Sequence, residues 1–336
     1  MDWEKGYTAQ YYMSVVDPAT WRDIERIEIT GGSISKESTG LLQSADVDCV
    51  KYVQGMERWV RIWLTARQDD SSEHVALFTG LACSPDRDIN GNFESNKVQC
   101  YSVLKPADDI LLERGWYAPS GFDGASLIKR LLSVCPAPVE PVEESPQLKS
   151  SIIAEDGETR LTMVWKILKA INWRLKINGK GEITIIPITE TPSYYIDAIE
   201  HDIIEPKITA TRDWYACPNV FRAIEDDLVA IARDDSPDSF LSTVNRGREV
   251  WMEETNCDLN EDETVADYAV RRLREEQEVS HVVSYARRYI PDIEPSDLVT
   301  LSLPKQDIVG VYKINSQNIQ LGYGAKVSEE VVQYER

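Results

Sequence analysis

The segment from Glu263 to Leu303 decides the expected fold, and it reads ETVADYAVRRLREEQEVSHVVSYARRYIPDIEPSDLVTLSL. In its first part, apolar residues recur at helical spacing and leave an opposite side that is almost wholly charged. In its second part, apolar residues alternate, and Pro291 and Pro295 bracket a turn. We therefore expect a helix over 261–279 followed by two strands, and nothing in this unit is equipped for catalysis.

The start of that helix carries a capping signal. Asn260 is placed to accept an unpaired backbone N–H of the first turn, and Glu263, three residues later, is placed to reach back. Beyond the helix, Tyr285 and Tyr289 suit a half-buried strand, and alternation resumes at Leu298. The order helix, strand, turn, strand is typical of a structural scaffold.

Length and composition predict a globular chain of two or three domains, with 336 residues and 42% hydrophobic content. No run of about 18 apolar residues is present to span a bilayer. The N-terminus lacks the apolar core of a secretory signal, so we expect synthesis in the cytoplasm. Six cysteines are scattered without a CxxC pair, which favours reduced, mostly buried thiols over disulfides. They are Cys49, Cys83, Cys100, Cys135, Cys217 and Cys257.

The formal net charge of −21 argues against stable nucleic-acid binding. A surface this acidic repels phosphates and offers no basic stripe from which counterion release could supply affinity. The plainer interpretation is that the acidity keeps the chain in solution.

Two β-domains are expected, one at each end of the chain. Residues 1–118 contain short alternating apolar runs separated by turn residues, among them Gly31-Gly32. Residues 201–336 begin with β-like pieces, continue through a polar stretch from Arg233 to Arg248 and end with the helix at 261–279 and its strands. The two stretches are predicted to form separate β-domains.

A small α/β domain is expected between them, at 119–200. Thr159 caps its helix, and Asn178-Gly179 between alternating strands predicts a hairpin. A proline- and glutamate-rich stretch at 136–150 predicts an extended, solvated loop rather than packed structure. The expected class is α+β, mainly β, with the α/β domain inserted between two β-domains.

Candidate catalytic motifs are weak. His74, His201 and His281 lie far apart in the sequence and lack the spacing of metal ligands. No nucleophile elbow or phosphate loop is present, and Gly31-Gly32 and Gly322-Tyr-Gly324 are too short to cradle a phosphate and are expected to be turns. We assign no catalytic, cofactor-binding or metal-ligating residue, and no cofactor.

Acidic and aromatic clusters leave functional alternatives open. Glu143-Glu144 and Glu225-Asp226-Asp227 supply the carboxylates that a glycosidase or a calcium site would use, although consecutive loop acids are more typical of a solvated surface. The aromatic clusters suit stacking on sugar rings or packing in a core or subunit interface. They are Trp59 with Trp63, Tyr194-Tyr195 and Trp214-Tyr215.

Several motifs follow one another from Pro218 to the end of the chain. They are PNVFRAI at Pro218–Ile224, the pair Gly247-Arg248, the helix with Tyr268-Ala269 and Leu273, YARRYIPDIEPSDLV at Tyr285–Val299, and GVYKI at Gly310–Ile314. Their order resembles the tail-hub proteins of phages, the baseplate hub family that is related to late control protein D and to the base of the type VI secretion spike. The resemblance is clearest over this part, and the predicted order of domains is compatible with it over most of the chain.

The resemblance implies a structural, non-enzymatic part of the virion tail baseplate. It implies two barrel-like β-domains, each similar to a tail-tube subunit, in a trimer that forms a pseudo-sixfold ring. Such a ring would join the hexameric tail tube to the trimeric central spike, contact other baseplate proteins and let DNA pass without specific binding. A negative lumen would keep the DNA from sticking. No membrane insertion is implied, and no interface residue is assigned.

Two other classes remain alternatives at the level of sequence. A tail-associated hydrolase that degrades cell wall or carbohydrate would need a pair of carboxylates in a cleft. A carbohydrate-binding module would need exposed aromatic side chains such as Trp214 and Tyr215. The sequence does not distinguish a contractile from a flexible tail, or a phage from a bacteriocin or another injection device.

Overall fold

The computed structural model describes residues 1–50, 57–90, 93–142, 144–189, 191–197, 205, 207–212, 214–225, 228–255, 257, 264–277 and 281–334. The chain forms two compact units. Unit 1 contains Met1–Ile208 and Ser284–Val331, and unit 2 contains Thr209–Val283 and Val332–Arg336. The structure is mainly β with a smaller share of helix, which confirms the predicted α+β class.

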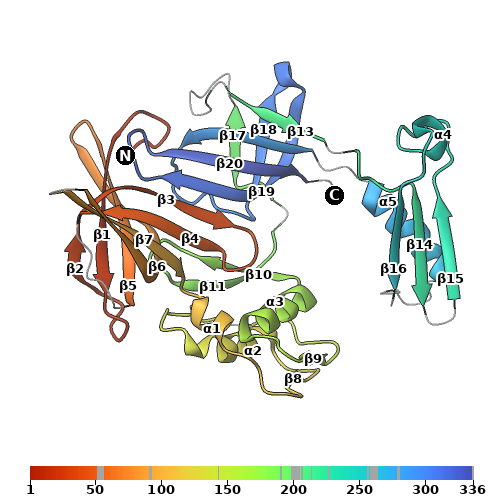
Figure 1. Ribbon diagram of the computed structural model, residues 1–336, viewed down its shortest axis with the longest axis horizontal. Helices are drawn as coiled ribbons and strands as arrows, with labels where there is room; N and C mark the ends of the chain where they lie inside the picture. The colour runs from red at the N-terminus through yellow and green to blue at the C-terminus, as the bar shows by residue number, and fades with distance from the viewer. Residues whose placement is uncertain are drawn as a thin grey trace. The chain divides into compact units, whose positions relative to one another are not determined.

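The N-terminal strands of unit 1 form an antiparallel array (Figure 1). Their order in the sheet is β3-β4-β7-β6-β5-β1-β2. The strands are β1 (Thr8–Val16), β2 (Asp23–Ile27), β3 (Ile29–Glu37), β4 (Gln43–Cys49), β5 (Arg58–Gln68), β6 (Ser71–Asn90) and β7 (Phe93–Ser102). Alternate residues of these strands, such as Val47, Ile62 and Val98, form a fully buried core. The alternation therefore predicted both the strands and the side of them that is buried.

Strands from the far end of the chain join the same sheet. They are β12 (Tyr194–Asp197), β17 (Val282–Arg288), β18 (Leu298–Leu303), β19 (Ile308–Gln320) and β20 (Lys326–Gln333), with a short 3-10 helix, η2 (Pro304–Gln306), between β18 and β19. The first half of β19 pairs with β18, and its second half pairs antiparallel with β3, Ser316–Gln320 against Ser33–Glu37. One sheet thus connects segments that are almost 300 residues apart in sequence.

The two sets of strands share one order. In the first set it is β4-β7-β6-β5-β1, and in the second it is β17-β20-β19-β18-β12. The members also follow one another along the chain in the same succession in both sets. One orientation differs, because β1 is antiparallel to β5 whereas β12 is parallel to β18.

Gly31 and Gly32 were predicted to form a turn, and this prediction was wrong. Both glycines lie inside β3, where the register against β4 shifts between Ile29 and Gly31. Gly32 has φ +133°, and a Cβ atom there would lie 2.2 Å from the carbonyl oxygen of Asp46. The pair therefore marks a β-bulge with a close backbone approach, which are features that glycine permits within a strand. Gly322 and Gly324 do lie in the turn between β19 and β20.

Helices and short strands between β7 and β12 pack around their own hydrophobic core. They are α1 (Lys105–Asp109), β8 (Tyr117–Ala118), α2 (Gly124–Leu131), η1 (Leu132–Val134), β9 (Ile152–Ile153), α3 (Arg160–Ile171), β10 (Trp173–Ile177) and β11 (Ile183–Pro187). Thr159 caps α3 as predicted, since its hydroxyl accepts a hydrogen bond from the N–H of Thr162. Asp123 caps α2 in the same way.

The stretch at 136–150 is irregular and most of its described residues are exposed, as predicted, but some of its residues are packed. Ala137 and Leu148 are buried, and Val139 makes a bridge to Ile183 of β11. Ser145 donates to the cap residue Asp123 and accepts from the N–H of Ala125. The prediction treated proline and glutamate content as evidence of solvation, whereas the apolar residues between them fill the core beneath the helices.

The predicted hairpin joins β10 and β11, and its tip docks on the N-terminal strands. The hydroxyl of Thr79 donates to the carbonyl of Gly179 at 2.8 Å. The carbonyl of Lys180 accepts from the indole N–H of Trp21 at 2.8 Å and from Arg61 at 3.0 Å. The tip therefore acts as a contact between two parts of unit 1, which the turn motif did not indicate.

Unit 2 consists of a small sheet with one long helix against it. Its elements are β13 (Thr209–Thr211), β14 (Val220–Glu225), β15 (Leu228–Arg233), α4 (Thr243–Arg246), β16 (Trp251–Thr255) and α5 (Val265–Gln277). Phe221 of β14 and Tyr268 and Leu273 of α5 belong to its core. The helix predicted at 261–279 is thus confirmed over α5.

The cap of α5 differs from the expected one. Asn260 and Glu263 lie outside the described residues. Thr264 and Asp267 instead form a reciprocal pair, in which the Thr264 hydroxyl accepts from the N–H of Asp267 at 3.2 Å and Asp267 accepts from the N–H of Thr264 at 3.4 Å. This is a capping box with aspartate in place of glutamate.

The boundaries expected at 118/119 and 200/201 remain predictions. The stretch 201–336 is divided between the two units, with α5 in unit 2 and β18 and β19 in unit 1. Within the described part of the chain, the strand order runs from β13 to β2, and no pairing joins those two ends into a closed barrel. No helix in that part is long and apolar enough to cross a membrane.

Candidate assembly surfaces

One face of the sheet in unit 1 is covered by small polar and acidic side chains. Residues directly opposite each other share a face, so the register of β19, β3, β4 and β7 defines it. We call this surface the polar face. Its members are Ser33, Ser35, Glu37, Ser44, Asp46, Asp48, Lys97, Gln99, Tyr101, Ser316, Asn318 and Gln320.

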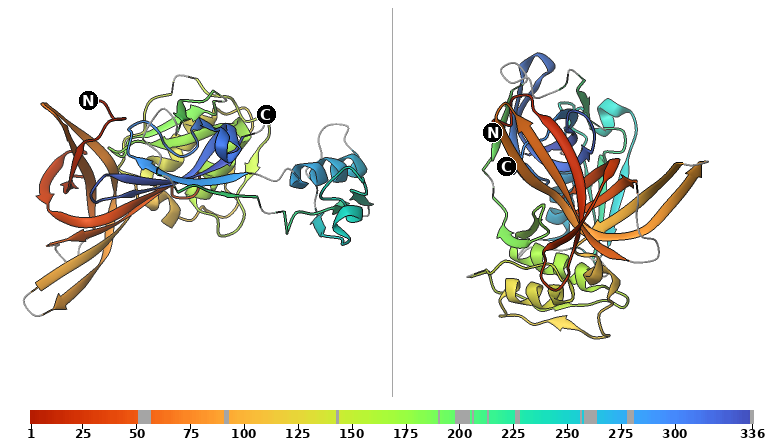
Figure 2. Two further views of the ribbon diagram at one scale, coloured as in Figure 1. Left: turned by 90° about the horizontal axis from the view of Figure 1, so that it is seen from above. Right: turned by 90° about the vertical axis from the view of Figure 1, so that its left-hand side faces the viewer.

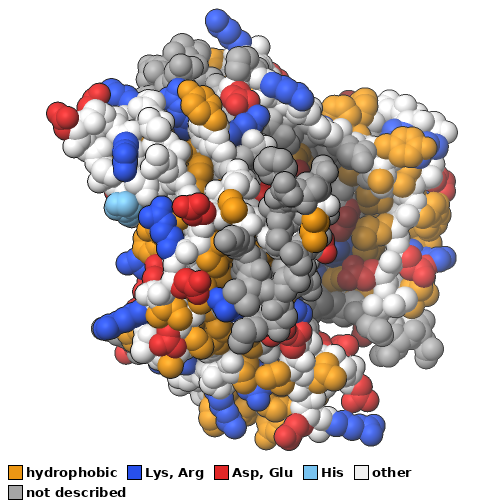
Figure 3. Space-filling model, turned by 60° about the vertical axis from the view of Figure 1, so that its left-hand side comes forward, with side chains coloured by type: hydrophobic (Ala, Val, Ile, Leu, Met, Phe, Trp, Pro, Cys, Tyr) orange, Lys and Arg blue, Asp and Glu red, His pale blue; other side chains and the backbone are white. Residues whose placement is uncertain are grey.

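The opposite face of the same strands is buried. Ile34, Val47, Val98 and Ile319 lie there in the hydrophobic core. An antiparallel sheet of this type can have one face packed on the core and the other exposed to water, so the polar face is available to water. On the part of the surface shown in Figure 3, Lys and Arg side chains are scattered among Asp and Glu side chains rather than gathered in a basic patch.

The charge of the polar face is negative. Glu37, Asp46 and Asp48 lie on it, and Lys97, directly opposite Asp48, is the single basic residue among its members. A hollow of about 300 Å³ continues the surface towards β17 and β20, where Ser284, Ser328 and Glu330 contribute further hydroxyls and a carboxylate. Such a surface repels phosphates. The neutral hydroxyls and amides between its carboxylates would bind phosphates only weakly.

A buried ion pair lies behind this hollow. Arg287 and Glu329 have side chains that are 1% and 0% exposed, and Arg287 Nε donates to Glu329 Oε2 at 2.9 Å. Gln317 donates to the same carboxylate at 2.6 Å and to the carbonyl of Ile293 at 2.8 Å. Burial alone would lower the pKa of Arg287, but the Glu329 carboxylate outweighs it and raises that pKa. The pair therefore joins β17, β19 and β20 by charge-assisted hydrogen bonds.

A second ionic cluster connects the polar-face strands to the helical part of unit 1. Lys36 of β3 lies 3.2 Å from Glu294, which also lies 3.6 Å from Lys176 of β10. Arg174 of β10 pairs with Asp297 at 2.8 Å. The turn between β17 and β18 is thus held from both sides by partly buried charges, an arrangement that fixes geometry more than it adds stability.

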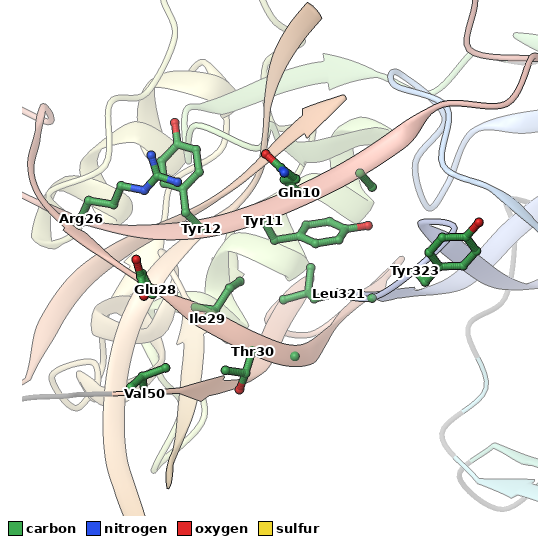
Figure 4. A pocket seen from close by; sticks show the side chains of 13 residues that line it. Gln10, Tyr11, Tyr12, Arg26, Glu28, Ile29, Thr30, Val50, Leu321 and Tyr323 are labelled. Atoms are coloured by element: carbon green, nitrogen blue, oxygen red, sulfur yellow. The ribbon is translucent and has the colours of Figure 1, made fainter. Parts of the chain in front are cut away.

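An open groove of about 570 Å³ lies where β1, β3 and the turn after β19 meet (Figure 4). Figure 4 shows the ring of Tyr11 directed towards Leu321 and the guanidinium of Arg26 beside the ring of Tyr12. The distance from Arg26 to the centre of that ring is 4.1 Å. Tyr323 at the rim is fully exposed, so the groove is an open surface and not an enclosed active site.

The cysteines match the prediction of reduced, mostly buried thiols. All six are free thiols, and five of them are buried, with Cys83 partly exposed. Burial raises the pKa of Cys49 to about 12 and that of Cys135 to about 11, so neither is a thiolate near neutral pH. A nucleophilic role would need the opposite shift.

The histidines and acids singled out in the sequence are dispersed. His74 is hydrogen-bonded to Thr65 at 3.0 Å, and His281 is buried near the start of β17. Glu225 accepts a hydrogen bond from the N–H of Cys257, and Glu144 is exposed. His201, Glu143, Asp226 and Asp227 lie outside the described residues. Within the described part, no three His, Cys, Asp or Glu side chains form a metal-binding group.

The aromatic clusters divide into packed and exposed ones. Trp59 packs against the helical core, and the indole N–H of Trp63 donates to Asp23 at 2.8 Å. In β12, Tyr194 donates to Glu4 at 2.7 Å and Tyr195 is exposed. In unit 2, Trp214 and Tyr215 are exposed. Packing therefore accounts for the tryptophans of β5, which the sequence left between two interpretations.

The exposed aromatic residues of unit 2 are held in place by arginines. Arg248 lies 4.5 Å from the centre of the Tyr215 ring and donates to the carbonyl of that residue at 2.6 Å. Arg246 donates to the carbonyls of Trp214 and Cys217. The segment 214–217 is therefore ordered by its backbone, and its aromatic rings present an exposed apolar surface.

Comparisons with known proteins place the fold. No family model and no curated protein sequence matches the chain. The solved structures that it resembles include the 43 kDa tail protein of prophage MuSo2 from Shewanella oneidensis, with a TM-score of 0.68 and 12% identity over 96% of both chains. They also include a tail protein from Neisseria meningitidis MC58, with a TM-score of 0.67 and 14% identity over 96% of both chains.

A third similar structure comes from a secretion system. The Escherichia coli c3393 protein is described as a component of the type VI secretion system with structural similarity to the T4 bacteriophage tail proteins gp27 and gp5. Its TM-score is 0.51 and its identity 8%, over 92% of this chain and 74% of that one. The chain therefore has the fold of these phage tail proteins and of this type VI secretion component.

Proposed function

We propose that this protein is the structural hub of a phage or phage-like tail baseplate. Three copies form a pseudo-sixfold ring that joins the hexameric tail tube to the trimeric central spike and lets DNA pass. The observation that carries this proposal is the repeated strand order, β4-β7-β6-β5-β1 and β17-β20-β19-β18-β12. Two similar tube-like halves in each chain would give six similar elements in a trimer.

The junction between the halves supports a ring. Within one chain, the second half of β19 pairs with β3 through five residue pairs, so one half continues the sheet of the other by edge-to-edge hydrogen bonding. The same kind of junction, repeated between chains, would generate a closed circle of sheets. A threefold circle of two-part chains would match a hexamer on one side and a trimer on the other.

The polar face supports the passage of DNA. Its carboxylates Glu37, Asp46 and Asp48 lie on a continuous sheet surface, and the remaining members are mainly hydroxyls and amides. A bore lined in this way repels phosphates and does not retain the polymer. The net charge of −21 is then a property of the channel as well as of the outer surface.

The proposal makes the protein a non-enzymatic component of the virion tail baseplate. Its partners are two further copies of itself, the tail tube protein, the central spike protein and other baseplate proteins. The similar solved structures are those of phage tail proteins and of a secretion-system component, which supports a structural role. A structural role agrees with cysteines that are free and mostly buried.

Assembly is the decisive test. We expect light scattering of the purified chain, alone or mixed with a tail-tube protein, to give three copies per ring. Negative-stain images should show a threefold ring with a central opening. A chain that stays monomeric and binds neither tube nor spike would contradict the proposal. Glycan hydrolysis that disappears when a carboxylate is replaced would favour the alternative of a tail-associated hydrolase.

The DNA-passage part has a separate test. Replacing Asp46 and Asp48 with lysine places new positive charges on the polar face, and we expect slower or incomplete genome ejection from particles that still assemble. A matched control replaces the exposed Glu113, which lies outside the polar face, with lysine and should leave ejection unchanged. Equal genome ejection by both variants would show that the polar face does not line the bore.

A further inference from the structure

Among the described residues, the outer half of β6 pairs along one edge only. Residues Ser71–Ala82 of β6 pair with β5, and residues Gly80–Asn90 pair with β7. From Gly80 to Ala82 both neighbours are present, so β5 and β7 lie on opposite edges of β6. Beyond them, Asp86–Asn90 pair with β7 alone within the described part of the chain. Figure 2 shows this end of the β6–β7 hairpin projecting from unit 1 as an arm.

The corresponding edge in the second set of strands is occupied. In the repeated order, β19 corresponds to β6 and β18 to β5. The first half of β19 pairs with β18, as the first half of β6 pairs with β5. The second half of β19, Ser316–Gln320, pairs with β3 of the same chain. In the part of the chain that the structure describes, the outer half of β6 therefore lacks the neighbour that its counterpart has.

The missing neighbour would correspond to β3, and the second set contains such a strand. β3 lies between β1 and β4 in the chain and next to β4 in the sheet. β13 lies between β12 and β17 in the chain and next to β17, whose first two residues belong to the same unit as β13. All three residues of β13 are exposed, and β13 is the last strand of the sheet among the described residues. It therefore offers the open edge that β3 uses within the chain.

We infer that β13 of one copy of this chain pairs with the outer half of β6 of the next copy. This inference rests on the proposed ring, and it deepens the proposal by naming the strands that close it. The occupant is a second copy of this chain, because the contact repeats between chains the pairing that β3 and β19 already make within one. Joining two different edges head to tail gives a ring when the rotation closes.

The two edges have the properties of a strand-pairing interface. Natural proteins protect long open edges, because unpaired backbone N–H and C=O groups promote association. The arm continues β6 to Asn90, and Ile89 on it is 64% exposed. Ala210 at the centre of β13 is flanked by two threonines, which suit a strand. Pairing would cover both edges at once, as β-strand addition does in peptide recognition.

Crosslinking between two marked chains tests the inference. An affinity-tagged I89C chain is mixed with an untagged A210C chain, both in a C83S background that removes the partly exposed thiol, and treated with a short bismaleimide. Any product that contains tagged and untagged chains joins two copies. The flexible reagent allows for either strand register. A matched control pairs A210C with I24C, whose position on β2 is also exposed but lies outside the inferred contact.

We expect the I89C and A210C mixture to give several-fold more mixed dimer than the control mixture. We also expect a chain carrying both substitutions to give crosslinked trimers. If light scattering shows trimers but mixed dimers do not exceed the control, the strand assignment is overturned while the ring stands. If no assembly forms, with or without the tail-tube protein, both the assignment and the proposed function fail.

Discussion

Replacing Gly179 with alanine should undock the β10–β11 hairpin from the N-terminal strands. A Cβ atom at this position would lie 1.7 Å from the carbonyl oxygen and 2.3 Å from the carbonyl carbon of Ala76. Both are backbone atoms of β6, so neither can rotate away, and the tip must withdraw by roughly 1.5 Å to reach ordinary contact. The φ of Gly179 lies outside the left-handed region, so the effect is one of space and not of backbone strain.

The size of the effect follows from the contacts at the tip. Withdrawal would break the hydrogen bond from Thr79 to the carbonyl of Gly179 and those from Trp21 and Arg61 to the carbonyl of Lys180. Two of these bonds are between neutral groups, at about 1 kcal/mol each, and the one from Arg61 is worth about 1.5–3 kcal/mol. We therefore expect the free energy of unfolding to fall by about 3–5 kcal/mol.

Urea unfolding followed by tryptophan fluorescence measures this loss, because Trp21 lies in the contact. The matched control is Gly322→Ala, where an added Cβ meets no atom within 4 Å and φ is also outside the left-handed region. The control should stay within about 0.5 kcal/mol of the parent chain. A change of less than about 1 kcal/mol for Gly179→Ala would refute the idea that the hairpin tip is a close contact.

Three further outcomes follow from individual side chains. Glu329→Gln leaves the Arg287 charge unpaired and should lower the free energy of unfolding by about 3–5 kcal/mol in chemical denaturation. The double variant R287M/E329L should recover most of that loss. Equal stability of the two variants would contradict the burial of the pair. Asp123→Ala should cost about 1 kcal/mol. Burial raises the pKa of Asp123, but hydrogen bonds from Ser126 and Ser145 outweigh it and lower that pKa below 3.8. The contribution of Asp123 to the free energy of unfolding is therefore complete above pH 3.8 and is lost as the pH falls through the lower pKa of the folded state. Acid titration of D123A beside the parent chain measures the difference. Native labelling near pH 8 should modify Cys83 before Cys100, because burial raises the pKa of the Cys100 thiol and closes access to it, and simultaneous labelling would indicate local opening.

The repeated strand order explains why the relationship between the two halves was not visible in the sequence. The order of strands in a sheet depends on which backbones pair, and many different side chains satisfy the same alternation. The halves also differ in their insertions. The second set has α5 and its small sheet between β13 and β17, where the first set has only the short turn between β3 and β4. Comparing residues along the chain therefore does not align them.

The sequence-based predictions failed where they inferred packing from amino-acid composition alone. Gly31-Gly32 has the composition of a turn, but the close approach of the Asp46 backbone makes it a bulge within β3. The stretch at 136–150 has the composition of a solvated linker, yet Ala137 and Leu148 are buried in the helical core. In both cases the structure depends on a contact with residues that are distant in sequence, so local propensity could not predict it.

The sequence by itself determined the local elements of this protein. Periodicity predicted α5, β17 and β18, the Asn178-Gly179 turn predicted a hairpin, and scattered cysteines predicted free thiols, because these features depend on neighbours within a few residues. Only the tertiary structure decided that β19 pairs with β3, that the hairpin tip docks beside Ala76 and that the acidic side chains gather on one face. These features depend on strand register and on contacts between distant segments. The free energy of the whole fold decides them, so no short stretch of sequence predicts them.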